Sequence, residues 1–348
     1  MSEILHPNRG LTNAEMVEYL GLPQDMITKL QTAEPTEYEA HSNEFLSALV
    51  NKIVYQVVDS VEFTNPFKKY DSFPVKFGDT IENIAVELPR GYKYDRNATD
   101  PFGKKTNAVK TLYATINYEM QYETTVYRED LRRAVLSEYG LMNLTSSILD
   151  TLGTAMALDE YEATLAMLSN GDIYANGIEE LSKGATDADT AKLMTTTIAN
   201  AVSAMDILMT ANNKQHYTTR TPKDRTLLVI KYDLLNQINF DYLAGVYNLS
   251  KVELLDNIIK VDSFQVAKRD SNGDIIKDSD GKAVMVGNDI DFAIIDTKGF
   301  DCHVALQDSG YIYNPKAKYT NYYSDLWKII AYKTWFNARA FKLKDTTK

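Results

Sequence analysis

The most regular pattern of apolar and polar positions in this chain lies between residues 112 and 127. Its even positions, which begin at Leu112, hold mainly apolar or aromatic side chains, whereas its odd positions include Asn117, Glu119 and Glu123. Because successive side chains of a strand point to opposite faces, this alternation predicts one long strand with a single apolar face. At ~3.3 Å per residue, such a strand would run about 50 Å.

Two helices are predicted from apolar residues that repeat every three or four positions. The longer one covers residues 128–169 and ends before Asn170-Gly171, because glycine commonly terminates helices. Its repeat is formed by Leu141, Leu144, Ile148, Leu152, Ala155 and Leu158. A shorter amphipathic helix is predicted at residues 38–61.

The second half of the chain alternates between predicted helices and strands, which indicates an α+β fold. Helices are predicted at 190–211 and 233–238, and short strands at 226–230, 258–264, 283–286, 290–295 and 301–306. The stretch from Trp327 to Phe341 is apolar on both faces and predicts a last strand. No internal repeat of fixed period is present.

Two long stretches lack such periodicity. Residues 1–36 are interrupted by proline and glycine, so we expect an arm with little core of its own. Residues 64–110 contain four prolines and three glycines around a predicted strand at 80–88. A connection of this length inside a compact domain usually serves a function, so we expect an extended loop here.

A third stretch, 265–290, is rich in turn residues. Its segment starting at Asp270 superficially resembles a calcium loop, but an EF-hand needs Gly at the sixth position and Glu at the twelfth. Ile275 and Gly281 stand there instead. Asn272-Gly273 and Asp280-Gly281 are therefore interpreted as hairpin turns, and no metal site is expected.

Composition places the chain among ordinary globular proteins. It has 348 residues, of which 44% are hydrophobic and 24% charged, and a formal net charge of −11. Its one cysteine, Cys302, excludes an intramolecular disulfide and fits a reducing compartment. The first residues lack the pattern of a signal peptide, and no stretch is long and apolar enough for a membrane span. We therefore expect a soluble protein made in a cytoplasm.

The charges are unevenly distributed. Residues 1–63 hold 3 basic and 10 acidic side chains, a net charge of −7. Residues 89–105 hold 5 basic and 2 acidic ones, net +3, and residues 312–348 hold 8 and 2, net +6. Oppositely charged segments let copies of one chain attract each other. The alternative is that these charges are simply solvated.

Known catalytic patterns are missing. There is no glycine-rich phosphate loop, no G-x-S-x-G elbow and no H-E-x-x-H motif. Cys302 and His303 are adjacent, so on a strand they would point to opposite faces and could not act as a nucleophile–base pair. Glu119 and Glu123 would lie about 13 Å apart, too far for glycoside hydrolysis. We expect neither enzymatic activity nor a cofactor.

The basic loop at 89–105 also carries Tyr92, Tyr94 and Phe102. Aromatic and basic residues together can bind single-stranded nucleic acid. However, the loop contains two aspartates and the whole chain is acidic, which favours a surface that faces protein.

Three stretches, read in the order of the predicted elements, carry a family resemblance. They are residues 81–89 (IENIAVELP) before the basic loop, 126–135 (VYREDLRRAV) entering the long helix, and 335–341 (WFNARAF) near the end. This layout resembles the major capsid (head) protein of tailed double-stranded DNA bacteriophages. That family has the Hong Kong ninety-seven type fold, which encapsulin shells share.

The resemblance implies a division of the chain into the parts of that fold. Residues 1–37 would form an N-terminal arm, 38–63 a helix of the peripheral domain, and 64–110 an extended loop over a neighbouring subunit. The peripheral domain's long strand and spine helix would occupy 111–174, the axial domain 175–300, and a return to the peripheral domain 301–348. The turn-rich stretch 265–290 would decorate the axial domain.

The same resemblance implies function and partners. The chain would assemble as hexamers and pentamers into an icosahedral or prolate head around double-stranded DNA, without sequence-specific DNA binding. Scaffold, portal and decoration proteins are further expected partners, and the virion is the expected location. Heterologous contacts need two complementary patches. Our candidates are, on the loop, Arg90, Lys93, Arg96, Lys104 and Lys105, and on the receiving side Glu34, Glu37, Glu39 and Glu44.

Two alternatives stay open at this point. One is another homo-oligomeric structural protein, such as an encapsulin-like shell or a phage tail or portal component. The other is an α/β enzyme whose site is assembled from scattered Asp, Glu, Lys and Tyr residues. The absence of nucleophile motifs and metal ligands in the sequence disfavours the enzyme.

Overall fold

The structure is a computed structural model. It describes residues 63–75, 80–89, 91, 93–94, 96, 108–127, 138–238, 257–270, 273–317 and 319–344. Contacts divide the chain into two compact units, the first made of Met1–Glu62, Glu123–Leu152 and Tyr311–Tyr322, the second of Phe63–Tyr122, Gly153–Gly310 and Tyr323–Lys348. The predictions for residues 1–37, 38–61 and 128–137 lie outside the described residues.

A five-stranded sheet forms the core of the second unit. Its strands run in the order β4 (Ile178–Ser182), β12 (Ala338–Lys344), β9 (Phe292–Asp296), β5 (Thr226–Lys231) and β6 (Ile258–Val261). Strand β9 is antiparallel to both of its neighbours, whereas the two outer pairs are parallel. Every residue of β9 is buried, and so is all of β5 except its last residue. Strands covered on both faces need continuous apolar runs, which the sequence supplies at both places.

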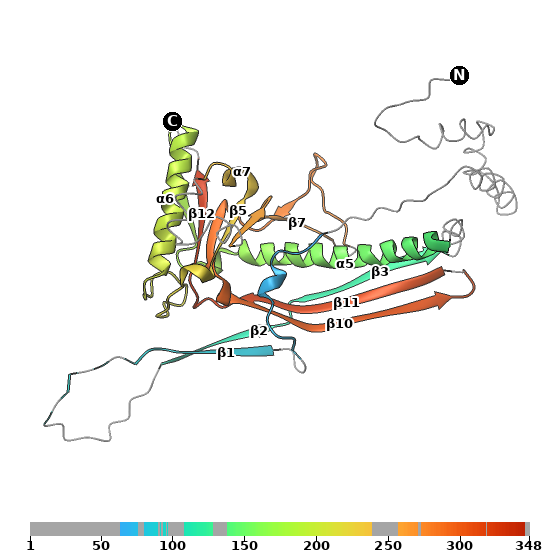
Figure 1. Cartoon of the computed structure of the whole chain (residues 1–348), viewed down its shortest axis with the longest axis horizontal. Helices are drawn as coiled ribbons and strands as arrows, with labels where there is room; N and C mark the ends of the chain where they lie inside the picture. Colours follow the sequence, from blue (N-terminus) through green and yellow to red (C-terminus); the bar gives the residue numbers. More distant parts are fainter. Residues whose placement is uncertain are drawn as a thin grey trace. The chain divides into compact units, whose positions relative to one another are not determined.

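One face of this sheet is covered by the helix α6 (Asp187–Met205) (Figure 1). Its buried residues, among them Met194, Ile198 and Val202, pack with Leu228 and Phe292 of the sheet in one cluster. The helix begins earlier than predicted because the Thr186 side chain caps it by accepting a hydrogen bond from the Asp189 backbone. It ends at Met205 rather than residue 211. The apolar residues beyond, Ile207 and Leu208, are exposed and do not continue its core face.

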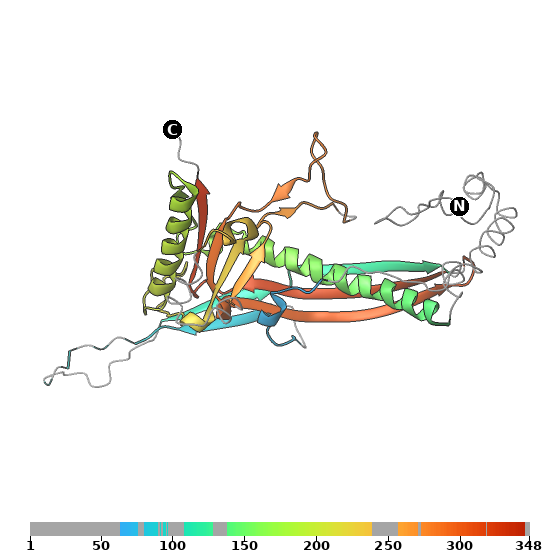
Figure 2. The same ribbon diagram turned by 45° about the horizontal axis from the view of Figure 1, so that its top comes forward.

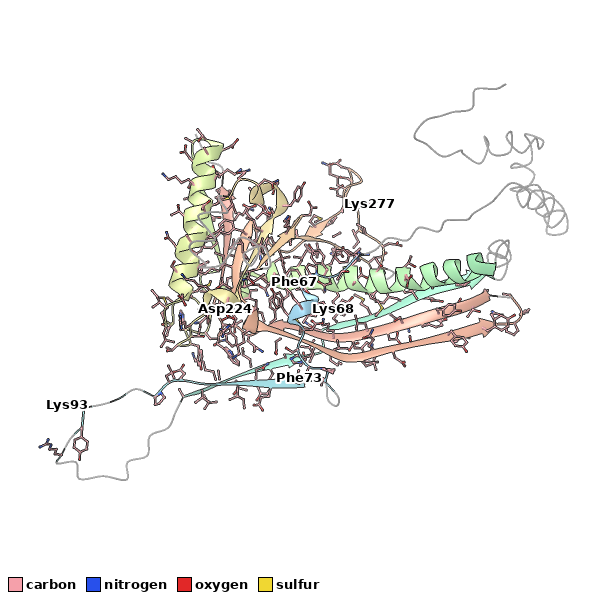
Figure 3. The ribbon with its side chains drawn as sticks, in the orientation of Figure 1. Phe67, Lys68, Phe73, Lys93, Asp224 and Lys277 are labelled. Carbon is pink, nitrogen blue, oxygen red and sulfur yellow. The ribbon has the colours of Figure 1, made fainter. Side chains whose placement is uncertain are left out.

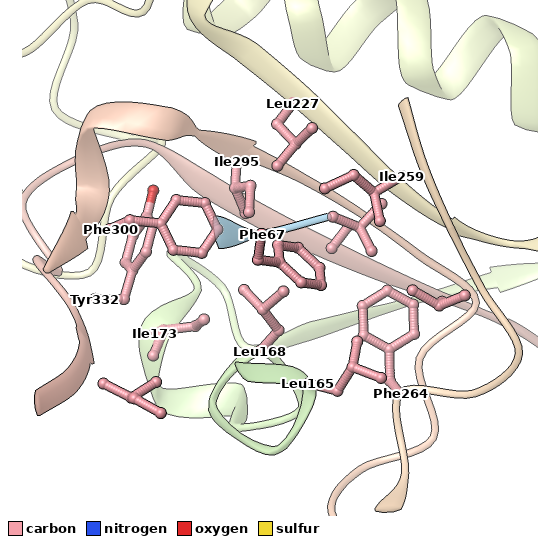
Figure 4. Packing of buried hydrophobic residues seen from close by; sticks show 14 of the residues in the cluster. Phe67, Leu165, Leu168, Ile173, Leu227, Ile259, Phe264, Ile295, Phe300 and Tyr332 are labelled. Atoms are coloured by element: carbon pink, nitrogen blue, oxygen red, sulfur yellow. The ribbon is translucent and has the colours of Figure 1, made fainter. Parts of the chain in front are cut away.

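The other face of the sheet packs against the end of the long helix α5 (Glu138–Leu168) (Figure 4). Leu165 and Leu168 of this helix share a cluster with Leu227 and Ile259 of the sheet and with Phe67, which precedes the 3-10 turn Lys68–Tyr70. The predicted end of the helix is confirmed, since Asn170 follows it and begins a short 3-10 turn. With 31 residues, α5 is about 46 Å long.

Three long strands form a second sheet in the order β10 (Phe300–Asn314), β11 (Tyr319–Tyr332) and β3 (Tyr118–Tyr127) (Figure 2). In the second unit, the hydroxyl of Tyr122 lies 2.7 Å from that of Tyr118 and donates a hydrogen bond to Asp159 of α5. In the first unit, Asn321 of β11 bonds to Thr125 and Glu123 of β3. The strand predicted at 301–306 continues to Asn314. The sequence pattern does not predict this extension, because residues 306–313 are exposed and show no one-sided apolar pattern.

The single strand predicted at residues 112–127 is wrong, because the chain forms two strands in different sheets. Strand β2 (Val109–Thr115) pairs with β1 (Thr80–Val86), while β3 pairs with β11. Asn117 makes the change of partner: its side chain exchanges two 2.9 Å hydrogen bonds with the backbone of Ile330. The alternation itself holds across the break, since Ala114, Tyr118 and Val126 are all buried.

The single last strand predicted from Trp327 to Phe341 is also wrong. The chain leaves the three-stranded sheet at Tyr332, turns between Lys333 and Asn337, and enters the five-stranded sheet as β12. A backbone hydrogen bond from Phe336 to Lys333 closes the turn. The stretch is apolar on both faces because it contributes to the interior of two sheets, which a local pattern does not distinguish from one buried strand.

The turn-rich stretch forms small antiparallel pairs, including β7 (Val266–Ala267) with β8 (Met285–Val286). Gly273 and Gly281 have φ angles of 87° and 77°, which other residues rarely adopt. This confirms the two hairpin turns predicted there. The remaining short elements are α7 (Tyr232–Leu235), close to its prediction at 233–238, and single 3-10 turns. None of the described helices is long and apolar enough to span a bilayer.

Replacing Phe292 by alanine tests the core of the second unit. The ring is fully buried and stacks on Phe341 with centroids 4.9 Å apart. We expect the free energy of unfolding to fall by about 3–5 kcal/mol because the substitution removes apolar contacts and leaves a cavity. Urea denaturation followed by circular dichroism measures this. Ile207→Ala, at an exposed position, is the control, and an equal loss in both variants would contradict the assignment of the core.

Candidate intersubunit interface

The structure describes two of the residues predicted for the interface. Lys93 and Arg96 both lie exposed on the segment that connects β1 to β2, and Figure 3 labels Lys93 there. Tyr94 between them is 81% exposed. The other predicted residues, Arg90, Lys104, Lys105, Glu34, Glu37, Glu39 and Glu44, lie outside the described residues, so their roles stay predictions.

Strands β1 and β2 form a two-stranded ribbon whose exposed face carries four apolar or aromatic side chains beside Thr80, Glu82, Thr111 and Thr115. Pairing runs in register from Thr80 opposite Thr115 to Val86 opposite Val109. Opposed residues share a face, so Ile84, Val86, Val109 and Tyr113 lie together on one side of the ribbon. They are between 50% and 67% exposed. We call these four residues the ribbon face.

The opposite side of the ribbon is fixed to the second unit. Ala85 and Ala114 are buried there, and Asn83 donates a 2.5 Å hydrogen bond to Asp301 of β10. The hydroxyl of Tyr217 donates to the backbone carbonyl of Val86 over 2.9 Å. The ribbon is thus held by one side while the ribbon face is left to solvent.

The prediction from charge named Lys93 and Arg96, which are exposed and whose role stays a prediction, and it did not name the ribbon face. A signal was present in the sequence, because Ile81, Ile84, Ala85 and Val86 put apolar residues on both sides of the predicted strand. A strand with one solvated side normally alternates between apolar and polar residues. The departure from alternation marks a side that needs a second cover.

The chain entering the ribbon lies along the outer edge of β10. Backbone amides of Ser72 and Val75 donate to the carbonyls of Cys302 and Val304 over 2.8 and 2.9 Å. Tyr70 stacks on Phe300 with centroids 5.1 Å apart and rings nearly parallel. We call residues 70–75 the loop root, because they join the core to the N-terminal end of the extended loop.

A buried ion cluster pins the loop root. Lys328 of β11 is 2% exposed and contacts both carboxylate oxygens of Asp71 at 2.7 Å, as well as the carboxylate of Glu160 on α5. Burial would lower the pKa of Lys328, but hydrogen bonds to the two carboxylates outweigh it and raise that pKa. Burial raises the pKa of Asp71. One ammonium group therefore joins the loop root, the sheet and the helix.

Chemistry at Cys302 is suppressed by its surroundings. The thiol is buried in the core, and burial raises its pKa to about 12. His303, next in the chain, instead bonds to Phe73 and Asp301, as expected for a side chain on the opposite face of the strand. Among the described residues, no group of His, Cys, Asp and Glu is placed to hold a metal ion.

A cavity of about 450 Å³ lies between the end of α5 and the second sheet. Its lining includes Tyr118, Ala166, Met167 and Tyr332, and contains no carboxylate, lysine, arginine or histidine. Such a wall offers no carboxylate, thiol or imidazole to hold a metal ion and little for general acid–base chemistry. Its one titratable kind of group is tyrosine, and burial raises the pKa of Tyr118 to about 12.

Comparison with solved structures defines the class of protein. The chain has the fold of tailed-phage capsid proteins, of the Hong Kong ninety-seven type: it matches a chain in the capsid structure of Staphylococcus phage Andhra with a TM-score of 0.66. That match covers 84% of this chain and 88% of the other at 13% identity. Residues 23–342 match the family model of the Phi29-like phage major capsid protein, and the chain belongs to that family.

The matched relatives carry the same description. The major capsid protein of Bacillus phage B103 is 27% identical over 311 residues, and that of Bacillus phage PZA is 23% identical over 306. The alignments cover 87% and 86% of this chain but only 64% and 63% of the two relatives. The chain thus spans under two thirds of their length. The predicted α+β capsid fold and the family resemblance are confirmed.

The reactivity of Cys302 provides a test of its burial. With a pKa of about 12 and no solvent access, the thiol stays protonated at pH 8, so we expect no reaction with a disulfide reagent such as DTNB in the folded protein. The thiolate, which is the reactive form, appears only as pH approaches the raised pKa or once the chain unfolds. In guanidinium chloride, one equivalent should react. Rapid native labelling would contradict this environment.

Proposed function

We propose that this chain is the repeating subunit of a phage head and assembles with copies of itself into a closed shell around double-stranded DNA. Membership of the Phi29-like major capsid family supports this. The observation that carries it is the ribbon face, which leaves Ile84, Val86, Val109 and Tyr113 uncovered while the other side of the same ribbon is fixed to the core.

A second copy is the natural cover for the ribbon face. Two-stranded ribbons are only marginally stable by themselves, and a contiguous exposed apolar patch marks a surface that binds protein. We propose that a different surface of the neighbouring copy receives the ribbon face, which makes the contact heterologous. Such contacts close into rings when the rotation between copies closes. We therefore propose hexamers and pentamers as the units of the shell.

Charge supports the same arrangement. Lys93 and Arg96 are exposed beyond the ribbon, in a segment of net charge +3, whereas residues 1–63 carry −7. Attraction between these segments would orient two copies before their apolar surfaces meet. We propose residues 64–110 as the loop that reaches over the neighbour, and the acidic arm as part of the surface that receives it.

The remaining assignments follow from membership of a structural family. We propose that the chain has no enzymatic role and needs no cofactor, that it is made in the host cytoplasm, and that it resides in the virion. Its net charge of −11 fits a shell that encloses DNA without gripping it, since phosphate binding relies on basic surfaces. Scaffold, portal and decoration proteins would be further partners.

Reversing charge on the loop should impair assembly without unfolding the subunit. In the double variant Lys93→Glu and Arg96→Glu, both side chains are exposed, so we expect a soluble chain with fewer complete particles. Negative-stain microscopy and sedimentation velocity would measure particle yield. Lys277→Glu with Lys282→Glu, exposed in the turn-rich stretch, makes the same change of charge elsewhere. Normal particles from the loop variant would contradict the proposal.

The ribbon face can be tested separately from charge. Ile84→Ser with Val109→Ser removes two apolar side chains that are 59% and 56% exposed, so unfolding should change little. If each side chain contributes about 1.5 kcal/mol on burial, association of two copies weakens by roughly 100-fold. Ile275→Ser with Val286→Ser is the matched control. Equal particle yields for both pairs would exclude the ribbon face as an interface.

A further inference from the structure

Lys328 is the one lysine that is buried in the described part of the chain. It lies on β11 between Leu326 and Ile330, whose side chains point to the same face of the strand and belong to the core cluster. Its ammonium group contacts the carboxylates of Asp71 in the loop root and Glu160 on α5. A primary amine and two carboxyl groups thus meet in apolar surroundings inside the second unit.

The nitrogen of Lys328 is within reach of the carboxyl carbon of Asp71. Its Nζ is 2.7 Å from Oδ1 and 2.7 Å from Oδ2 of that carboxylate. A nitrogen at equal distances from both oxygens of a carboxyl group lies ~3 Å from its carbon, which is the separation of a near-attack arrangement. Rotation about χ2 of Asp71, a soft torsion, turns the face of the carboxyl group towards the nitrogen. Glu160 contacts the same ammonium group through Oε1 alone, so Asp71 is the better placed of the two to be acylated.

Burial makes the charges of this cluster costly and favours a product that carries fewer of them. Removing charges from water is expensive, and here one ammonium group stands against two carboxylates. An amide between Lys328 and Asp71 removes two of these three charges from the interior. Burial also raises the pKa of Asp71, which favours its carboxylic acid, the form that an amine attacks.

We propose that Lys328 and Asp71 become joined by an isopeptide bond within the single chain, and that Glu160 moves the proton in this reaction. The uncharged amine of Lys328 attacks Cγ of the Asp71 carboxylic acid, and a C–N bond forms. Glu160 accepts a proton from the nitrogen and passes it to the departing hydroxyl, so the C–O bond breaks and water leaves. One ammonium and one carboxylate group are replaced by one amide and one water molecule, with no oxidation or reduction.

The surroundings also set the speed of this reaction. Hydrogen bonds to the two carboxylates raise the pKa of Lys328, so its uncharged amine is the minor form and the bond forms slowly after folding. The side chain of Asp71 is 20% exposed, against 2% for that of Lys328, which gives the released water a route to solvent. The N–H of the new amide donates to the Glu160 carboxylate, so this group keeps a partner.

The bond ties the loop root to β11 permanently. The contacts of Ser72 and Val75 with β10 are hydrogen bonds, which open and close with local unfolding. The amide instead joins two residues that lie 257 positions apart in the chain. Like a disulfide, it restricts the unfolded chain and so raises resistance to denaturant. It is a property of the single chain and does not rest on the function proposed above.

Peptide mapping by mass spectrometry tests the bond on the full, folded chain. Trypsin does not cleave after an acylated lysine, so we expect cleavage after Lys328 to be lost in protein that has been incubated for a prolonged time in its folded state. The tryptic peptide 70–76 should then be found joined to the peptide 319–333, with a mass lower than their sum by one water molecule. Fragmentation of the joined pair identifies the two linked residues.

Two variants and one internal control separate the bond from an ordinary ion pair. Glu160→Gln keeps the shape of the side chain but cannot take the proton, so the linked pair should form at least ~100-fold more slowly. Asp71→Ala should give no linked pair. Lys231 is the matched control, since it also contacts two carboxylates, those of Asp289 and Asp291, at 2.7 and 2.8 Å. Because Asp289 is 40% exposed and water reaches that site, we expect normal cleavage after Lys231.

Complete cleavage after Lys328 in the incubated, folded wild-type protein would overturn the proposal. A link from Lys328 to Glu160 would overturn the assignment of Asp71, and equal rates in the wild type and Glu160→Gln would overturn the role of Glu160. The mapping needs no particles, so it is independent of the assembly experiments. If loop variants assemble normally while the linked peptides are found, the proposed interface fails and the isopeptide bond stands.

Discussion

A ribbon of two strands cannot bury both of its sides by itself, and this constraint governs the extended segment of the chain. One side of β1 and β2 is fixed by Ala85, Asn83 and Tyr217, so the ribbon is ordered before any partner arrives. The ribbon face on the opposite side stays uncovered. Because the ribbon is already in place, covering it costs little conformational entropy, which favours association. The contacts that hold one side of the ribbon in place therefore prepare the ribbon face on the other side for binding.

The loop root shows how this order is achieved. Apolar packing at Phe67 and Tyr70 is continued by charged contacts at Asp71 and by backbone pairing at Ser72 and Val75. A buried ion cluster is a poor source of stability, because removing charges from water is costly. It does have a defined geometry, and leaving either carboxylate of the cluster unpaired would be costly. We interpret the cluster around Lys328 as a set of contacts that fixes the position of the loop root against β11 and α5.

Local pattern was enough to predict some of these features. Continuous apolar runs predicted β5 and most of β9, and the repeat from Leu141 to Leu168 predicted α5 over its described part. Alternation also gave the correct buried side at Tyr118. It gave the wrong continuity, because Asn117 mimics a backbone when it bonds to Ile330, 213 positions away in sequence. Nothing near Asn117 in the sequence indicates that partner.

The proposed interface also shows that a local sequence pattern does not reveal long-range partners. Net charge located the exposed Lys93 and Arg96, since charge needs no knowledge of pairing. The ribbon face needed the pairing of β1 with β2, and the loop root needed Asp71 to meet Lys328 across 257 positions. The extended loop is therefore fixed by contacts between residues far apart in sequence, and so is the five-stranded sheet of the body, in which β4 pairs with β12. The two are also coupled, because Lys328 and Phe300 of the body hold Asp71 and Tyr70 of the loop root.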